Sequence, residues 1–178
     1  MVKLEPIHRS FLLKETILGV VINAIICGLI TFFTFRSKEI ILLWGKDGLF
    51  FDLIPTLFFM TFCMTLGMTA ATRARIQRGK APAAPWHRSE HALLRFVPGM
   101  FVIRAVVFGV LALVILLPAT TGLLMVFEAF SLTFQGMLLF KTLFGALIGL
   151  LLTPVIVLAA MADKGGIVLQ QARGEAGS

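Results

Sequence analysis

Charged residues are scarce in this chain of 178 residues. Asp, Glu, Lys and Arg together make up 14% of the sequence, against about 25% in an average soluble domain. A water-soluble fold of this length needs a polar surface, and the chain has too few polar residues to form one. Tyrosine is absent, hydrophobic residues make up 58%, and the mean hydropathy is +0.98. This composition excludes a soluble globular domain.

Cysteine and histidine are also rare, and their scarcity excludes several kinds of enzyme. Cys27 and Cys63 each stand alone within an apolar run, so no Cys-x-x-Cys pair indicates a disulfide-generating oxidoreductase. We expect both cysteines to be small packing residues. Three histidines are too few for a membrane di-iron hydroxylase. The sequence therefore predicts neither an enzyme nor a cofactor.

One short motif resembles a metal site. His87, Glu90 and His91 match the inverted zinc-peptidase pattern, and His8 lies on the same predicted side of the membrane as a third ligand. That pattern belongs on a buried helix with a further acidic ligand, whereas here it borders an exposed proline-rich loop. Glu90 more simply begins the helix leading to the third apolar run, with Ser89 as its cap. We therefore expect no metal.

Long apolar runs account for the composition, and their length predicts how the chain crosses a membrane. Each is close to the ~20 residues that a helix needs to cross ~30 Å of hydrocarbon. Backbone groups in lipid must satisfy their own hydrogen bonds, so we expect helices. The first run is too long for a cleaved signal peptide. The sequence predicts an all-α membrane protein, a single domain over residues 1–178, with four transmembrane helices at about 16–35, 49–72, 99–117 and 137–161.

Basic residues are distributed unevenly among the connections, which predicts the orientation. Eleven Lys and Arg residues lie before the first run, in the loop 73–98 or after the fourth run, against three between the first two runs and none between the last two. An excess of positive charge marks the cytoplasmic side. We therefore expect both termini and the loop 73–98 in the cytoplasm. The same asymmetry accounts for the net charge of +7, so no nucleic-acid partner is predicted.

Two stretches outside the four apolar runs also allow structural predictions. Residues 120–135 are rich in Leu and Phe, yet they must connect two spans. We expect a short amphipathic helix in the outer interface, or a segment that dips back into the bundle. Residues 164–178 are rich in Gly, Gln and Ala and predict a flexible tail.

Small residues recur along single faces of the predicted helices. Gly145 and Gly149 form a small-x-x-x-small pattern, and Gly67 shares a face with Cys63 and Ala71. In a membrane such residues let helix backbones approach each other. We therefore expect Gly67, Gly145 and Gly149 to pack helices together.

Polar side chains within the runs are the stronger functional signal. An amide in mid-membrane needs a partner, so we expect Asn23 to form an inter-helix hydrogen bond rather than a substrate contact. By predicted depth, Asp52 and Lys141 lie near the outer face, and Glu15 and Arg104 near the inner face. Charges within spans pair or extend to the interface. Pairs of Asp52 with Lys141 and of Glu15 with Arg104 would close a central path at its two ends; the alternative is that the basic side chains extend to the interface.

Several short motifs occur together within roughly the first eighty residues. They are Asn23, Leu43-Trp44-Gly45, Asp52 with Pro55-Thr56, and Thr72-Arg73-x-Arg75-x-x-Arg78-Gly79. With them the chain resembles a family of short, uncharacterised bacterial inner-membrane proteins, some of them labelled permeases. The resemblance implies a four-span fold in the bacterial inner membrane and brings no activity. The small four-span multidrug exporters differ, because their essential acidic residue lies within the first span, where this chain has Asn23.

Two functions remain. The first is translocation by an oligomeric channel or a small-solute or ion transporter, with a path lined by Asn23, Asp52, Arg104, Lys141 and Glu15. Four helices enclose little space, so the path would form between subunits. The second is a non-catalytic accessory or assembly subunit that packs against a larger membrane complex. Besides the lipid bilayer, the expected partner is a second copy or a larger membrane protein. We favour translocation, and the sequence names no substrate.

Overall fold

The chain folds into long helices joined at one end by two short strands. A computed structural model describes residues 6–46, 48–82 and 98–175, with side chains as far as residue 163. In chain order the elements are α1 (Pro6–Phe35), β1 (Ile40–Leu42), α2 (Leu49–Gln77), α4 (Phe101–Val126), β2 (Ser131–Thr133) and α5 (Phe134–Glu175). Over these residues four helices are long and apolar enough to cross a membrane. The predicted all-α membrane fold with four transmembrane helices is confirmed.

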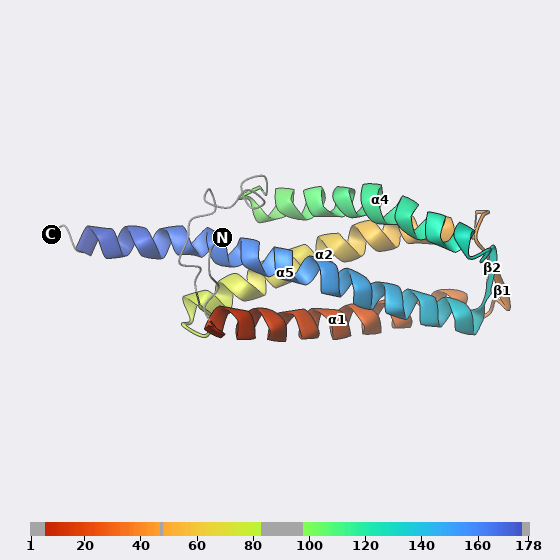
Figure 1. Cartoon of the computed structure of the whole chain (residues 1–178), viewed down its shortest axis with the longest axis horizontal. Helices are drawn as coiled ribbons and strands as arrows, with labels where there is room; N and C mark the ends of the chain where they lie inside the picture. The colour runs from red at the N-terminus through yellow and green to blue at the C-terminus, as the bar shows by residue number, and fades with distance from the viewer. Residues whose placement is uncertain (1–5, 47, 83–97, 176–178) are drawn as a thin grey trace.

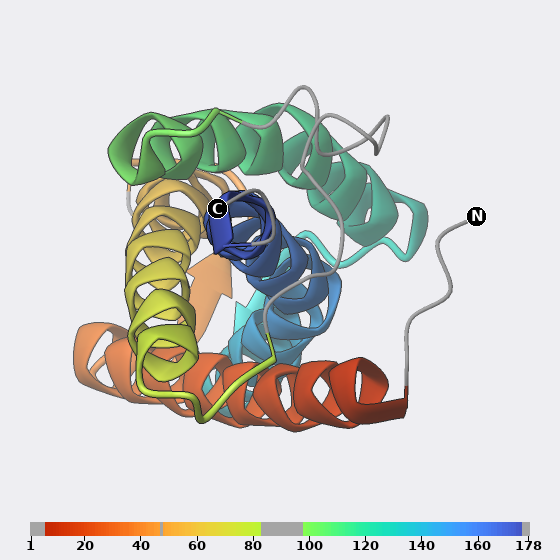
Figure 2. The same ribbon diagram turned by 90° about the vertical axis from the view of Figure 1, so that its left-hand side faces the viewer.

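The helices alternate in direction, and α5 is the central one. In Figure 1, α4 and α1 lie along opposite long sides of the molecule, with α2 and α5 between them. In the end view of Figure 2, α1, α2 and α4 surround α5 on three sides. Half of the most apolar stretch of α5 is buried, against 28% in each other helix. Outward-facing side chains such as Ile25, Val114 and Leu143 are large and apolar, which suits contact with lipid.

Glycines bring α1 and α5 into backbone contact. A Cβ added at Gly145 would lie 2.6 Å from the backbone oxygen of Asn23, and one at Gly149 would lie 2.8 Å from that of Gly19. Gly19 in turn leaves the space that the Thr153 side chain occupies. The two glycines of the small-residue pattern thus lie where the two backbones are in close contact, at a separation that a larger residue would prevent.

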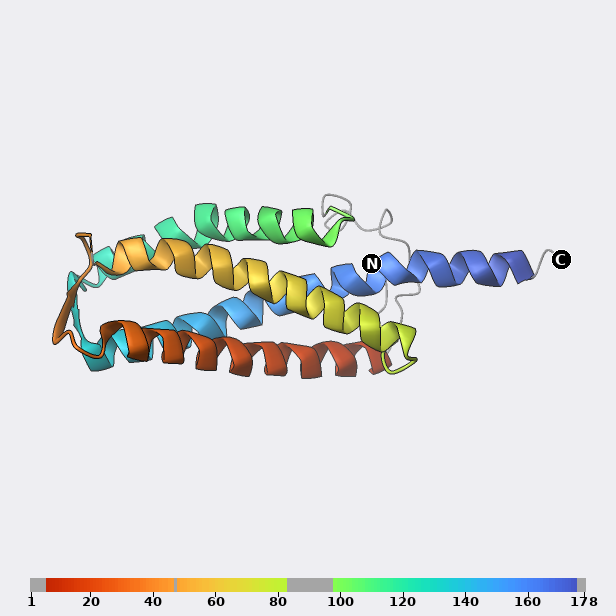
Figure 3. The same ribbon diagram turned by 180° about the vertical axis from the view of Figure 1, so that it is seen from behind.

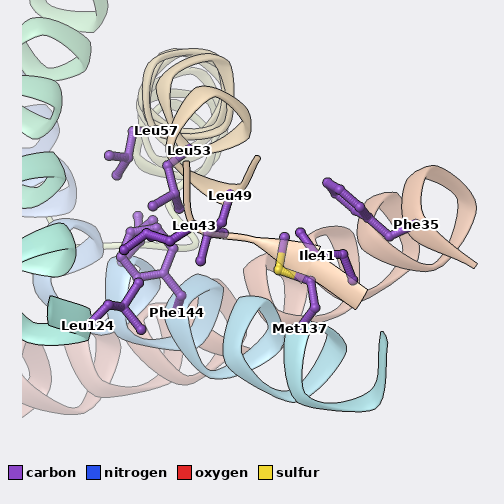
Figure 4. Packing of buried hydrophobic residues seen from close by; sticks show 10 residues of the cluster. Phe35, Ile41, Leu43, Leu49, Leu53, Leu57, Leu124, Met137 and Phe144 are labelled. Carbon is purple, nitrogen blue, oxygen red and sulfur yellow. The ribbon is translucent and has the colours of Figure 1, made fainter. Parts of the chain in front are cut away.

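A two-stranded antiparallel sheet joins the α1–α2 connection to the α4–α5 connection. Ile41 pairs with Leu132 at its centre. Ile41 is buried and belongs to an apolar cluster at this end of the bundle (Figure 4), which includes Phe35, Leu43, Leu49, Leu53, Met137 and Phe144. We call this the strand end; at the opposite end α1 begins and α2 finishes.

The helices continue beyond the apolar runs that predict them, as the C-terminal ends of α4 and α5 illustrate. α4 reaches Val126, so residues 120–126 belong to the same helix as the third span, and β2 takes residues 131–133. The location of this stretch in the outer interface stays a prediction. Pro118 lies within α4, because neighbouring groups in a bundle can satisfy the carbonyl that a proline leaves free. α5 continues to Glu175, where the sequence predicts a flexible tail from residue 164; the flexibility of that segment stays a prediction. The end of an apolar run shows where a helix stops being suited to lipid. The helix itself can continue, because its backbone hydrogen bonds do not depend on apolar side chains.

Candidate functional site

A cleft of about 660 Å³ lies between α1 and α2, with a lysine of α5 contributing to its lining. It exists because α1 packs mainly on α5 while α2 packs on α4 and α5, so that α1 and α2 diverge. In Figure 3, α2 runs obliquely, away from α1 at the strand end and close to it at the opposite end. The rim includes exposed apolar side chains such as Ile22, Ile26 and Phe59. The volume falls within the ~300–1,000 Å³ typical of small-molecule sites.

Lys141 of α5 meets Asp52 of α2 at the strand end of the cleft. The Lys141 Nζ lies 2.5 Å from Asp52 Oδ2 and 2.7 Å from the Thr56 hydroxyl oxygen. Thr56 donates in turn to the backbone oxygen of Asp52 at 2.8 Å. The Lys141 side chain is fully buried and that of Asp52 is 18% exposed. The pairing expected from depth along the runs is present, and the expected alternative, in which Lys141 extends to the interface, is not observed.

Glu15 of α1 and Arg75 of α2 form an ion pair at the opposite end of the cleft. The Glu15 side chain is buried, and that of Arg75 is partly exposed. The predicted pairing of Glu15 with Arg104 is therefore wrong. The prediction placed Arg75 in the loop 73–98, but α2 continues to Gln77 and brings Arg75 opposite Glu15.

Arg104 lies in a second charged network, away from the cleft. It donates to both carboxylate oxygens of Asp163 on α5, at 2.9 and 2.7 Å, and through Nε to the backbone oxygen of Pro98 at 3.2 Å. Arg73 of α2 donates to the same carboxylate at 2.6 Å. The network joins α2, α4 and α5. Arg104, predicted to line a path, is not among the residues that line the cleft, and it does not extend to the interface, because its side chain is fully buried.

Polar and sulfur-containing side chains face each other midway along the cleft. The Asn23 amide of α1 donates to the Gly19 backbone oxygen and to Met64 Sδ of α2, both at 2.8 Å. One turn further along α1, the Cys27 thiol donates to Met60 Sδ at 3.1 Å. Residues four apart share a helix face, so two pairs form between the antiparallel helices. Asn23 has the inter-helix partner that we expected, although that partner is a thioether.

The remaining predicted residues have different positions. Gly67 lines the cleft, and a Cβ added there would meet no described residue within 4 Å, so it packs closely on none of the described helices. His87, Glu90 and His91 lie outside the described residues. Over the ranges that the structure does describe, no group of three or more His, Cys, Asp and Glu side chains is placed to hold a metal ion.

Six residues of these networks were not among the predicted site residues: Thr56, Met60, Met64, Arg73, Arg75 and Asp163. A signal for three of them exists. Met60, Met64 and Met68 recur at steps of four residues, and Arg75 continues the same helix face seven residues later. No comparable pattern points to Asp163, because its partners come from two other helices.

Comparison with protein-family models, with curated proteins and with solved structures gave no match. The resemblance to short four-span inner-membrane proteins therefore stays a prediction, and the function has to be argued from the geometry.

Proposed function

We propose that this multi-pass membrane protein is a small-solute transporter whose substrate path is the cleft between α1 and α2. The observation that carries the proposal is the extent of the cleft, which reaches from the Glu15–Arg75 pair to the Asp52–Lys141 pair. Of the five side chains predicted to line a path, all but Arg104 line it.

The two ion pairs have the arrangement that gates require. Each joins two different helices, α1 with α2 at one end and α2 with α5 at the other. In both pairs one member is partly exposed, so a polar group of the substrate can replace it. The exchange is accessible because desolvation offsets much of the attraction within such a pair. Opening one pair at a time would give access from one side at a time.

The open rim of the cleft supports a homo-oligomer. Ile22, Ile26 and Phe59 are exposed along it, so one copy does not enclose the path. A polar solute needs a wall between itself and lipid, because polar groups are costly in hydrocarbon. A second copy placed over the rim would supply that wall. Together with the basic residues and the resemblance, this leads us to place the oligomer in the bacterial inner membrane with both ends cytoplasmic.

Cys63 is a natural probe of the proposal, because it is exposed and lines the cleft. In a Cys27→Ala protein, a water-soluble methanethiosulfonate reagent, which reacts with ionised thiols, should modify Cys63. The matched control is Val114→Cys in a chain without its native cysteines, since Val114 is exposed but does not line the cleft. Equally slow labelling at both positions would show a cleft without water and would overturn the path.

The gates can be tested with the same probe in vesicles of known orientation. Glu15→Gln weakens the pair with Arg75 and should speed labelling of Cys63 from that side only. Asp52→Asn weakens the pair with Lys141 and should speed it from the other side only. Faster labelling from both sides in both variants would contradict separate gates.

One observation favours the accessory function instead. Cys63, Gly67 and Ala71 give the cleft a lining of small residues, and nothing in the described chain fills the space beside Gly67. A helix of a partner protein would fit such a face. Cys63 would then be protected in native membranes and reactive only after purification, whereas the transporter predicts labelling in both.

A further inference from the structure

The middle of the cleft is rich in sulfur. Both cysteines and three of the eight methionines line it: Cys27, Cys63, Met60, Met64 and Met68. The methionines occur at steps of four residues on one face of α2 and form what we call the thioether column. Two of them already contact α1, Met60 through the Cys27 thiol at 3.1 Å and Met64 through the Asn23 amide at 2.8 Å.

Thioethers with a thiol are a donor set for a soft metal ion. Sulfur ligands of this kind select Cu(I), whereas hard cations prefer oxygen ligands. The carboxylates of the cleft, Glu15 and Asp52, are held by Arg75 and Lys141 at its ends. The middle of the cleft therefore offers sulfur and an amide.

The charge balance at Cys27 selects a monovalent ion. Cys27 is buried within a transmembrane helix, where an uncompensated charge is costly. Cu(I) that replaces the thiol proton forms a neutral copper–thiolate bond and releases one proton to water. A divalent ion with the same ligands would leave one positive charge in apolar surroundings. The electron count of the metal does not change, and no redox partner is needed.

We propose that Cys27, Met60 and Met64 form a site for Cu(I), and for its soft analogue Ag(I), midway along the cleft. The proposal rests on the proposed function, since it names the substrate class of the same cleft. Met60 is already in contact with Cys27. Met64 becomes a ligand when it releases the amide of Asn23, which keeps its bond to the backbone oxygen of Gly19. The long, unbranched methionine side chains allow the sulfur atoms to converge.

The thioether column also supplies the next ligand. Met68 follows Met64 by one turn toward the Glu15–Arg75 end and lines the same cleft. An ion that exchanges one neutral thioether for the next moves about 6 Å along the helix axis per step. The column thus provides both a binding site and a route toward one gate.

The test is Cu(I) binding by the full-length protein, purified under anaerobic, reducing conditions in detergent, against a chromophoric Cu(I) chelator. The wild-type protein should retain one equivalent per chain, release one proton on binding, and show sulfur ligation by X-ray absorption. Cys27→Ala and Met60→Leu should each weaken retention at least about tenfold, the loss found even for outer-shell partners of a metal. Met60→Leu conserves volume, so its thermal stability should stay close to that of the wild type.

Matched variants decide the assignment. Met125→Leu makes the same change at an exposed methionine that does not line the cleft, and Cys63→Ala removes the other thiol. Both should retain Cu(I) as the wild type does. If the wild-type protein retains no Cu(I), or if Cys27→Ala/Met60→Leu retains as much, the proposal is wrong. The proposal would also be wrong if Cys63→Ala lost Cu(I) retention while Cys27→Ala kept it.

Uptake of Ag(I) into proteoliposomes separates this proposal from the proposed function. Binding without uptake would retain the soft-metal site and overturn transport. Labelling of Cys63 by the water-soluble reagent in a protein that binds no Cu(I) would retain the path and overturn the soft-metal substrate. Binding with uptake that Met60→Leu abolishes would support both.

Discussion

Lys141 shows how a charge can lie within a membrane bundle. Its side chain is fully buried, and its ammonium group donates to the Asp52 carboxylate and to the Thr56 hydroxyl. Both partners come from α2, so the two contacts also join α2 to α5. Removing one member of the ion pair leaves a charge without compensation, whereas removing both leaves none.

Substitutions of this pair should therefore be non-additive. Asp52→Asn and Lys141→Met should each lower the free energy of unfolding by about 3 kcal/mol. This is the lower end of the range for breaking a buried ion pair, and we expect it because Asp52 is partly exposed. The double variant should be more stable than either single one, as measured by unfolding in mixed micelles. Lys46→Met, at an exposed lysine, is the control and should have little effect. Additive losses would show that the two side chains are not energetically coupled.

The contacts of Arg104 depend on the shape of its guanidinium group as well as on its charge. Its guanidinium donates to both oxygens of Asp163 and also to the Pro98 carbonyl, which an ammonium group cannot reproduce. Arg104→Lys keeps the charge and should lower the free energy of unfolding by about 2 kcal/mol, the value of one charged hydrogen bond. Arg78→Lys, at an exposed position, is the control. Equal stability of the two variants would contradict the role assigned to the combined contacts of Nη2 with Asp163 and of Nε with Pro98.

At the scale of elements, the positions of small residues decide which helices touch. Gly19, Gly145 and Gly149 lie between α1 and α5, so those backbones approach closely. Gly67 is equally small but faces the cleft, where no residue of the described ranges comes within 4 Å of an added Cβ. The same residue type thus marks a tight contact between α1 and α5 and an open space beside α2.

Enlarging Gly145 should separate α1 from α5. In Gly145→Ala the new methyl group would meet the Asn23 carbonyl and the Cys27 Cβ at 2.6 and 2.8 Å, and backbone cannot yield as a side chain can. We expect a loss of about 1–3 kcal/mol in unfolding free energy, the usual effect of overpacking. Gly122→Ala is the matched control, because among the described residues nothing lies within 4 Å of its Cβ position. It should be neutral or stabilising by up to ~1 kcal/mol through helix propensity. Equal stability of the two variants would contradict the close packing of α1 on α5.

At the scale of the whole molecule, α1 begins and α5 finishes at the same end of the bundle, opposite the strands (Figure 1). Arg73, Arg75, Arg78 and Lys80 lie at the C-terminal end of α2 or just beyond it, at this end too. An excess of positive charge marks the cytoplasmic side. We therefore propose that this end faces the cytoplasm and that the strand end lies on the other side of the membrane.

Reporter fusions test that orientation. A reporter that is active only in the cytoplasm should work when fused after Gly79 or after Ser178, and it should fail after Lys46. A reporter that is active only outside the cytoplasm should show the reverse pattern. Activity of the cytoplasmic reporter after Lys46 would contradict the assigned orientation.

The sequence by itself determined the four spanning helices, because the length and hydropathy of a run are local properties and lipid leaves the backbone no alternative to the helix. It also predicted the pair of Asp52 and Lys141, because the depth of a charge follows from its place in its run. Only the tertiary structure decided that Glu15 pairs with Arg75 and that Arg104 pairs with Asp163. Several charges lie at that depth, and the oblique course of α2 toward α1 selects among them. The cleft and its sulfur ligands likewise depend on tertiary structure, because α1 and α2 diverge through their separate packing on α5, which no pattern within one helix specifies.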